Sequence, residues 1–154
     1  MITIAPADFS DPALLDFLQQ HLADMSPTAP EESRHALDAS SLQSPGVRLW
    51  AAHDEPFLVG TIALAELEPG HEEIKSMRTS PVHRGKGVAS RLLEHALGDA
   101  RSRGVERVSL ETGSMEFFAP ARTLYRKAGF VETEPFGSYR ADPHSVFMTL
   151  SLTT

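Results

Sequence analysis

The sequence predicts one α+β (mixed α/β) domain, spanning residues 1–154, that is built around a single central sheet. Three observations lead to this prediction. The length of 154 residues suits one domain with a core of its own. Helical and strand patterns follow one another in the order β-α-α-β-β-β-α-β-α-β-β. Hairpins dominate this order, and its one strand–helix–strand unit should be right-handed and locally parallel.

The first strand leads into two predicted helices. Ser10-Asp11-Pro12 indicates a helix start, because an oxygen-bearing side chain can cap the first amides and proline fits the first turn. Apolar residues then recur at helical spacing at Leu14, Leu15, Leu18, Leu22 and Met25. A turn follows, and a second short helix begins near Pro30, with Glu31 and Glu32 suited to its positive end.

Three strands are predicted in the middle of the chain. Residues 47–53 and 56–68 indicate two strands that a tight turn around Asp54-Glu55 joins. Residues 71–80 form the third, which is less obvious because it is rich in polar residues.

A strongly amphipathic helix follows the third of these strands. Its apolar stripe consists of Ala89, Leu92, Leu93, Ala96, Leu97 and Ala100, and Gly104 ends it. The remaining predicted elements are a strand at 105–112, a helix at 119–130 that Gly129 ends, and strands at 130–136 and 145–152.

Composition and charge exclude several classes of function. The chain has no cysteine, so disulfides and cysteine nucleophiles are excluded, and its seven histidines show no tight metal-ligand spacing. The net charge of −7 makes nucleic acid an unexpected partner, because phosphate polymers are bound by basic faces. No apolar run is long enough for a membrane helix and no secretory signal is apparent, so we expect a cytoplasmic protein without a membrane partner.

Two glycines and two basic residues stand directly before the amphipathic helix, in Arg84-Gly85-Lys86-Gly87. The first amides of a helix have no internal partner, and with the helix dipole they bind anions. Bare glycines let a phosphate approach the backbone closely. Either this loop binds the diphosphate of a coenzyme, or the glycines only shape a turn and the basic side chains are solvated.

The segment MRTSPVHRGKGVASRLLEHAL resembles the acyl-coenzyme-A-binding motif of the GNAT N-acetyltransferase superfamily. The family's loop reads Arg/Gln-x-x-Gly-x-Gly/Ala, which Arg84, Gly87 and Ala89 meet. ARTLYRKAGF resembles the family's next helix, and the order of elements also agrees. The resemblance implies a mixed, mostly antiparallel sheet of six to seven strands flanked by about four helices, in a bacterial branch whose members mostly lack an assigned substrate.

The resemblance also implies acetyl-CoA as co-substrate, without a metal. Backbone groups of Met77, Arg78 and Thr79 would bind the pantetheine arm and the acetyl oxygen. The diphosphate would lie on the amides of Arg84, Gly85, Lys86, Gly87, Val88, Ala89 and Ser90.

Tyr125 matches the family's tyrosine acid, which protonates the departing sulfur, and its alternative role is that of a half-buried core residue. Glu111 is the first choice for the base that deprotonates the amine, directly or through water, although it could be a plain surface or capping carboxylate. Glu73 is placed where other branches of the family have their base, and a structural role is preferred for it.

The acceptor site is expected between the first two helices, the turn that joins them and the late hairpin. Its candidate residues are His21, Arg34, His35, Trp50, Phe118 and Tyr139, each of which could also be an ordinary surface or core residue. Phe118 stands where many members of the family have an asparagine that contacts the cofactor, so Phe117 and Phe118 could instead wall the pantetheine or acceptor pocket.

The expected reaction is direct acetyl transfer, in a ternary complex, to the primary amine of a small molecule. No covalent acyl-enzyme is expected, because the chain has no cysteine and no apparent Ser-His-acid set. The alternatives are acetylation of a protein or peptide amine, and a non-catalytic acyl-CoA sensor. The resemblance makes a homodimer plausible.

Overall fold

The computed structural model describes residues 1–25 and 39–153. Its strands are β1 (Thr3–Pro6), β2 (Val47–Asp54), β3 (Phe57–Glu68), β4 (His71–Thr79), β5 (Arg107–Gly113), β6 (Val131–Glu132) and β7 (Ser145–Ser151). Its helices are α1 (Pro12–Met25), α2 (Ala39–Leu42), α3 (Val88–Ser102) and α4 (Ala119–Lys127), with short 3-10 helices at Pro81–His83 and Glu116–Phe118. Apart from the second predicted helix, which begins outside the described residues, these elements follow the predicted order.

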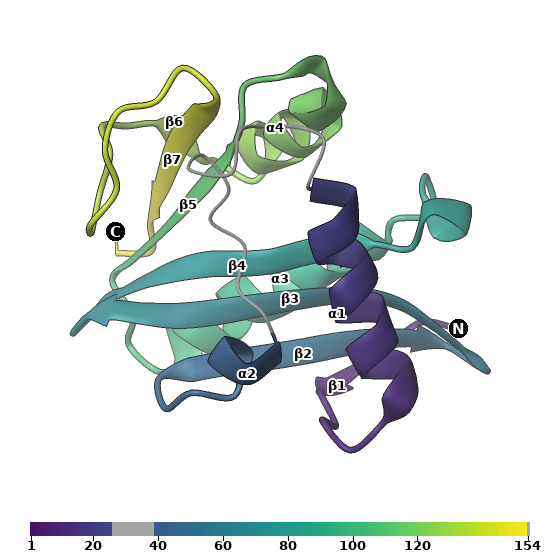
Figure 1. Ribbon diagram of the computed structural model, residues 1–154. Helices are drawn as coiled ribbons and strands as arrows, with labels where there is room; N and C mark the ends of the chain where they lie inside the picture. Colours follow the sequence, from purple (N-terminus) through teal and green to yellow (C-terminus); the bar gives the residue numbers. More distant parts are fainter. Residues whose placement is uncertain (26–38, 154) are drawn as a thin grey trace.

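The described strands form one seven-stranded sheet in the order β1-β2-β3-β4-β5-β7-β6 (Figure 1). All neighbouring strands are antiparallel except β4 and β5, which are parallel and joined by α3. The fold class is therefore the predicted one. A parallel pair needs a crossover connection, and the predicted strand–helix–strand unit supplies it.

Helices cover both faces of the sheet. Figure 1 shows α1 and α2 in front of the strands and α3 behind them. The α1 face of the sheet has a small apolar cluster of Leu14, Leu18, Leu42, Leu49 and Ala63. The α3 face has the larger core, which includes Trp50, Ile62, Leu64, Ile74, Leu92, Leu93, Ala96, Leu110, Tyr125 and Met148.

Local signals place the helix ends well. The Asp11 carboxylate accepts a hydrogen bond from the Ala13 amide at 3.0 Å, as the predicted start of α1 requires. After α3, Gly104 has φ +80° and its amide donates to the Arg101 carbonyl at 3.1 Å. This left-handed glycine cap ends the helix where the sequence indicated.

Three details of the sequence prediction are wrong or lie outside the described residues. Leu15 is 40% exposed, because the buried face of α1 uses Phe17 instead. The last-but-one strand is only Val131–Glu132, not 130–136, because Pro135 lacks an amide hydrogen and Gly137 turns the chain at φ +58°. The helix predicted near Pro30 lies outside the described residues.

The parallel strands β4 and β5 separate after four paired positions. Their pairing begins at His71 with Arg107 and ends at Ile74 with Leu110. Beyond this point β4 pairs only with β3, and β5 pairs only with β7 (Figure 1). The two strands therefore open a gap in the middle of the sheet, and backbone groups on both of its sides lack a strand partner.

An ion pair fixes the end of α3 to the start of β4. The Arg103 guanidinium donates to both Glu72 carboxylate oxygens at 2.8 Å and to Asp99 at 2.8 Å. Glu72 is buried, so removing the arginine would leave a carboxylate without its main counter-charge.

We expect Arg103→Met to lower the free energy of unfolding by about 1.5–3 kcal/mol, the range for hydrogen bonds to charged groups. Urea denaturation of the wild-type protein and of the variant measures this difference in the free energy of unfolding. Arg101→Met, which removes an exposed cation from the same last turn, is the matched control, and its expected cost is at most about 1 kcal/mol. Equal losses in the two variants would show that the ion pair with Glu72 adds nothing.

Candidate functional site

Four of the predicted site residues lie on the strands that border the gap between β4 and β5. Met77, Arg78 and Thr79 follow the last β4–β5 pair on β4, and Glu111 follows it on β5. Because the edges of the gap lack a partner strand, their backbone donors can hydrogen-bond to a chain-like ligand laid between them.

A bulge in β4 lies at this gap. Lys75 pairs with Ala63 and Arg78 with Thr61, so two residues of β4 oppose the single residue Ile62. Ser76 has φ +51°, which is the left-handed region, and its carbonyl accepts the Thr61 hydroxyl at 2.8 Å. Neither Ser76 nor Met77 has a register partner on β3, so the backbone of Met77, a predicted coenzyme-binding residue, lies at the interruption of the β3–β4 ladder.

The loop before α3 has the geometry expected of an anion site. Gly87 is the amino-terminal cap of α3 in the left-handed conformation, with φ +79°, and no side chain caps the helix. Gly85 has φ +80°, so both glycines are required by their backbone angles. A Cβ at either glycine would meet nothing within 4 Å, so open space lies beside them. Arg84 and Lys86 are exposed beside this helix end.

The remaining predicted coenzyme residues differ in exposure. Val88 is buried against the core, Ala89 is half-buried and Ser90 is exposed. The predicted contacts of these residues with the diphosphate involve only their backbone amides. The first turn of α3 leaves such amides without helical acceptors.

Tyr125 lies in the core on the α3 face of the sheet. It is 4% exposed, and its ring packs edge-to-face on Phe130 with centroids 5.7 Å apart. Burial raises the pKa of Tyr125 above its ordinary value, so the hydroxyl holds its proton at neutral pH. The described residues offer this hydroxyl no hydrogen-bond partner. The hydroxyl thus keeps the proton that the predicted role as an acid requires.

Glu111 lies on the opposite face. Leu110 belongs to the α3-side core, and successive strand residues point to opposite faces, so Glu111 points toward α1. Its carboxylate accepts the Ser145 hydroxyl at 2.7 Å. Tyr125 and Glu111 thus lie on opposite faces of the sheet.

A second charged cluster on the α1 face joins Glu73, Lys75 and Tyr139. The Lys75 ammonium lies 3.1 Å from the Glu73 carboxylate, and both side chains are largely buried. The Tyr139 hydroxyl accepts a hydrogen bond from Lys75 and donates one to Glu73. Burial, followed by the nearby Glu73 charge, raises the pKa of Tyr139. Glu73 is therefore held in a buried network, in keeping with the structural role preferred for it.

The sequence did not single out Lys75. The sequence did indicate that Lys75 lies beside Glu73, because residues two apart on a strand share a face. Their link to Tyr139, which is 64 residues from Lys75, depends on how the β6–β7 segment returns over the sheet. No local pattern encodes that contact.

The candidate acceptor residues are only partly brought together. Tyr139 lies beside the gap, and His21 is half-buried on α1. Trp50 is in the core on the other face, where its ring meets His95 at 5.6 Å. Arg34 and His35 lie outside the described residues.

Phe118 packs against the end of β5. Its ring meets that of Phe117 edge-to-face at 4.9 Å, and a Cβ on Gly113 would lie 2.0 Å from it. Gly113 is thus required for the aromatic side chain to approach the backbone. Phe117 remains 53% exposed, so these rings can still wall a ligand at this end of the gap.

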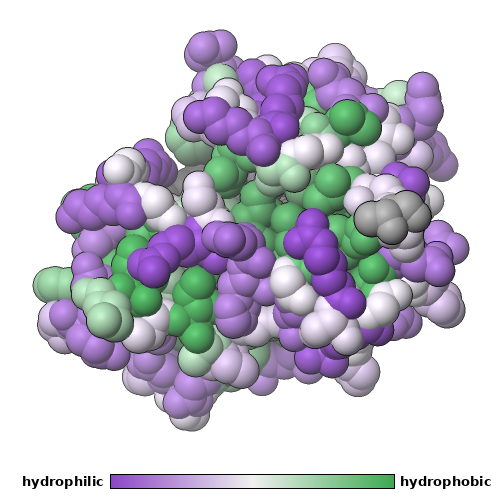
Figure 2. Space-filling view, turned by 180° about the vertical axis from the view of Figure 1, so that it is seen from behind, coloured by the Kyte–Doolittle hydropathy of each residue, from purple (hydrophilic) through white to green (hydrophobic). Residues whose placement is uncertain are grey.

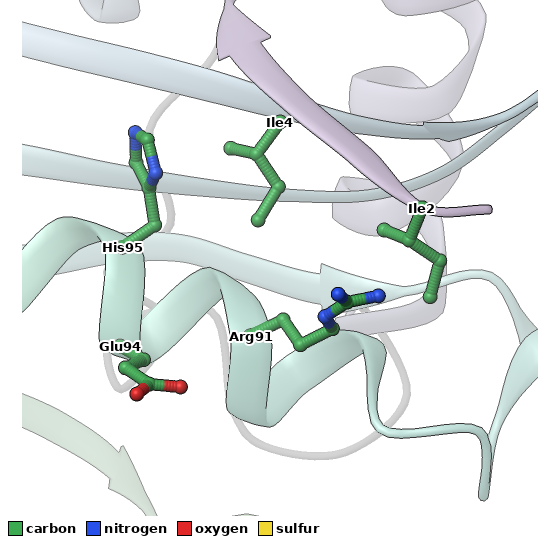
Figure 3. Close-up of a pocket in the computed structure, with 5 residues that line it drawn as sticks. All are labelled: Ile2, Ile4, Arg91, Glu94 and His95. Carbon is green, nitrogen blue, oxygen red and sulfur yellow. The ribbon is translucent and has the colours of Figure 1, made fainter.

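A shallow pocket of about 360 Å³ lies elsewhere, between β1 and α3 (Figure 3). It is lined by Ile2, Ile4, Arg91, Glu94 and His95, none of which was predicted for the site. In Figure 3 the Arg91 guanidinium extends toward Ile2. Figure 2, seen from the α3 side, shows apolar side chains gathered in a central hollow with polar ones around it.

The described residues lack two kinds of feature. Among residues 1–25 and 39–153, no three metal-ligating side chains gather closely enough to hold an ion. No helix in the same part of the chain combines the length and apolarity that a bilayer crossing requires.

Comparison with known proteins identifies the family. The model of the Acetyltransferase (GNAT) family matches residues 14–130. The chain belongs to the GNAT acetyltransferase family. It is 47% identical to the uncharacterized N-acetyltransferase YsnE of Bacillus subtilis, with 94% of this chain and 96% of that protein covered. It is 39% identical to the IAA acetyltransferase of Azospirillum brasilense, with 88% and 86% covered.

A solved structure also resembles this GNAT member in sequence and fold. A Klebsiella pneumoniae protein described as an acyl-CoA N-acyltransferase has 29% identity and a TM-score of 0.82, with 99% of each chain covered. The chain is therefore an N-acetyltransferase of the GNAT fold, and the resemblance noted in its motifs is confirmed.

Proposed function

We propose that this enzyme transfers the acetyl group of acetyl-CoA to the primary amine of a small molecule, by direct attack in a ternary complex. The observation that supports it most is the opened gap between β4 and β5, with an uncapped helix end beside it. The gap suits a thread-like pantetheine arm, and the helix end with Arg84 and Lys86 suits a diphosphate.

The proposed reaction needs one base, one acid and one oxyanion site. Glu111 takes a proton from the amine, directly or through a water molecule, and the amine nitrogen forms a bond to the thioester carbonyl carbon. Backbone amides of Met77, Arg78 and Thr79 stabilise the negative oxygen. The carbon–sulfur bond then breaks, and Tyr125 gives its proton to the departing sulfur. Burial keeps Tyr125 protonated for this step.

A small acceptor is supported by two observations. On the α1 face, Glu73, Lys75 and Tyr139 form a closely packed cluster beside the start of the gap, which favours a compact acceptor over a long one. In addition, the Azospirillum brasilense relative carries a name that gives IAA as its acceptor.

The test is release of free thiol from acetyl-CoA in the presence of single amines. The panel contains simple amines, amino acids, aminoglycosides, IAA and short peptides. Turnover with one or more small amines and none with peptides is the expected result. Turnover with peptides alone would identify a protein acetyltransferase. Coenzyme binding without turnover on any member of the panel would favour an acyl-CoA sensor.

A further inference from the structure

Arg122 ties helix α4 to the end of strand β5. One nitrogen of its guanidinium, Nη1, donates to the Gly113 carbonyl at 2.7 Å and to the Met115 carbonyl at 2.9 Å. Gly113 is the last residue of β5, and Met115 lies in the loop that leads to α4. Hydrogen bonds from a charged donor are roughly twice as strong as neutral ones, so this contact fixes the position of α4 against the strand.

The Gly113 carbonyl belongs to the edge of β5 that borders the gap. Gly113 is in register with Ser145 of β7. The next residue, Ser114, is the one that hydrogen-bonds across, because its amide donates to the His144 carbonyl at 3.1 Å. Alternate residues of an antiparallel strand direct their backbone groups to opposite sides, so the Gly113 carbonyl points away from β7. Arg122 therefore contacts the gap-side edge of β5.

Tyr125 follows Arg122 by three residues on the same helix. Residues three apart on a helix lie on the same side, so the contact that holds Arg122 also sets where Tyr125 lies relative to β5. The Tyr125 ring packs on Phe130, whose amide donates to the Tyr125 carbonyl at 3.0 Å. The position of the phenol relative to the gap thus depends on two contacts, one with Phe130 and one made by Arg122.

We propose that Arg122 is a positioning residue for acetyl transfer, which holds the Tyr125 hydroxyl where it can protonate the departing sulfur. This inference rests on the proposed role of Tyr125 as the acid. As the carbon–sulfur bond breaks, the proton passes from the Tyr125 oxygen to the sulfur, and Arg122 keeps all of its own protons. Such a transfer requires the acid to lie within hydrogen-bond reach of the sulfur, so a small shift of α4 on β5 is enough to slow it.

The effect of Arg122 is one of position. Burial is the cause that raises the pKa of Tyr125, so the phenol keeps its proton whether or not Arg122 is present. The groups proposed to bind the coenzyme lie on β4 and at the start of α3, away from the Arg122 contact. Loss of Arg122 should therefore lower kcat without weakening coenzyme binding.

The first test replaces Arg122 by methionine, which keeps an apolar side chain of similar length. With the amine that gives the fastest thiol release, we expect kcat to fall by about 10- to 100-fold, while the calorimetric Kd for coenzyme A stays within about twofold. Arg122→Lys keeps a charged donor for the two carbonyls and should recover part of the lost kcat.

Arg126→Met is the matched control. Arg126 lies one turn later on α4, where it pairs with Glu132 at 3.3 Å and its side chain is half exposed. An exposed pair of this kind adds little, so kcat should change by less than about twofold. Equal losses of kcat in the Arg126 and Arg122 variants would show that any change on α4 slows the enzyme, and would overturn the inference.

The second test is a double-mutant cycle with Tyr125→Phe. If Arg122 acts by placing the Tyr125 hydroxyl, Arg122→Met should lower kcat in the wild-type background and change it by at most about twofold in the Tyr125→Phe background. A merely structural contact would lower kcat by the same factor in both backgrounds. That result would contradict the positioning role.

Folding and the proposed function are checked separately. Thermal melting and coenzyme A binding show whether Arg122→Met is folded, and Arg122→Lys takes its place in the cycle if it is not. Wild-type kcat in Arg122→Met, beside a Tyr125→Phe enzyme that has lost activity, would refute the inference and leave the acid in place. Wild-type kcat in Tyr125→Phe, or thiol release with no amine of the panel, would refute the proposed function itself.

Discussion

Replacing Tyr125 by phenylalanine is expected to lower kcat by about 10²- to 10⁴-fold, the usual contribution of a positioned acid. The departing thiolate would then have to take its proton from water. Phenylalanine keeps the packing on Phe130, so the core should be preserved. Steady-state kinetics of thiol release measures the loss, and coenzyme A affinity should stay within about twofold of the wild type.

Tyr125→Phe should also change how the free energy of unfolding depends on pH in alkaline solution. Burial raises the folded-state pKa of Tyr125 above the ordinary value of about 10. Below pH 10 both the folded and unfolded states keep the proton, so the residue adds no pH dependence. Above it the unfolded state ionises first, and the stability linked to Tyr125 is lost as pH rises. Tyr125→Phe should therefore weaken the fall in unfolding free energy above pH 10.

A different result would contradict this role. If Tyr125→Phe retained more than half of the wild-type kcat, the tyrosine would be a core residue and another group would supply the proton. If coenzyme A affinity fell together with kcat, the hydroxyl would bind the coenzyme rather than protonate its sulfur.

Glu111→Gln is expected to lower kcat by about 10²- to 10⁴-fold through loss of the base. Glutamine is close in size and still accepts the Ser145 hydroxyl, so the fold and the coenzyme site should be unaffected. Turnover under saturating acetyl-CoA and acceptor measures the effect.

Glu73→Gln is the matched comparison for the other candidate base. It breaks the buried pair with Lys75, and such losses cost about 3–5 kcal/mol of folding stability. We expect the folded fraction of this variant to retain turnover. A folded Glu73→Gln protein without activity, beside an active Glu111→Gln protein, would reverse the assignment.

Much of the fold could be predicted because its signals are local. The stripe of α3, the glycine caps after α3 and α4, and the Asp11 cap all depend on neighbouring residues. The coenzyme loop belongs to the same class, since the left-handed angles of Gly85 and Gly87 come from a short motif.

The acceptor side could be predicted less well because long-range contacts form it. The separation of β4 from β5 and the bulge at Ser76 depend on pairing with other strands. The contact of Arg78 with Phe17 joins residues 61 positions apart, and no spacing rule indicates it. The short length of β6 is another example, because Pro135 limits its pairing and this effect is clear only once the partner strand is known.

Calorimetric titration of coenzyme A into the folded protein tests the central claim most directly. The account predicts heat from one binding site per chain, weakened when Arg84 and Lys86 are both replaced by alanine. Absence of heat with a protein that melts cooperatively would contradict it, because the gap and the helix end beside it would then hold no coenzyme.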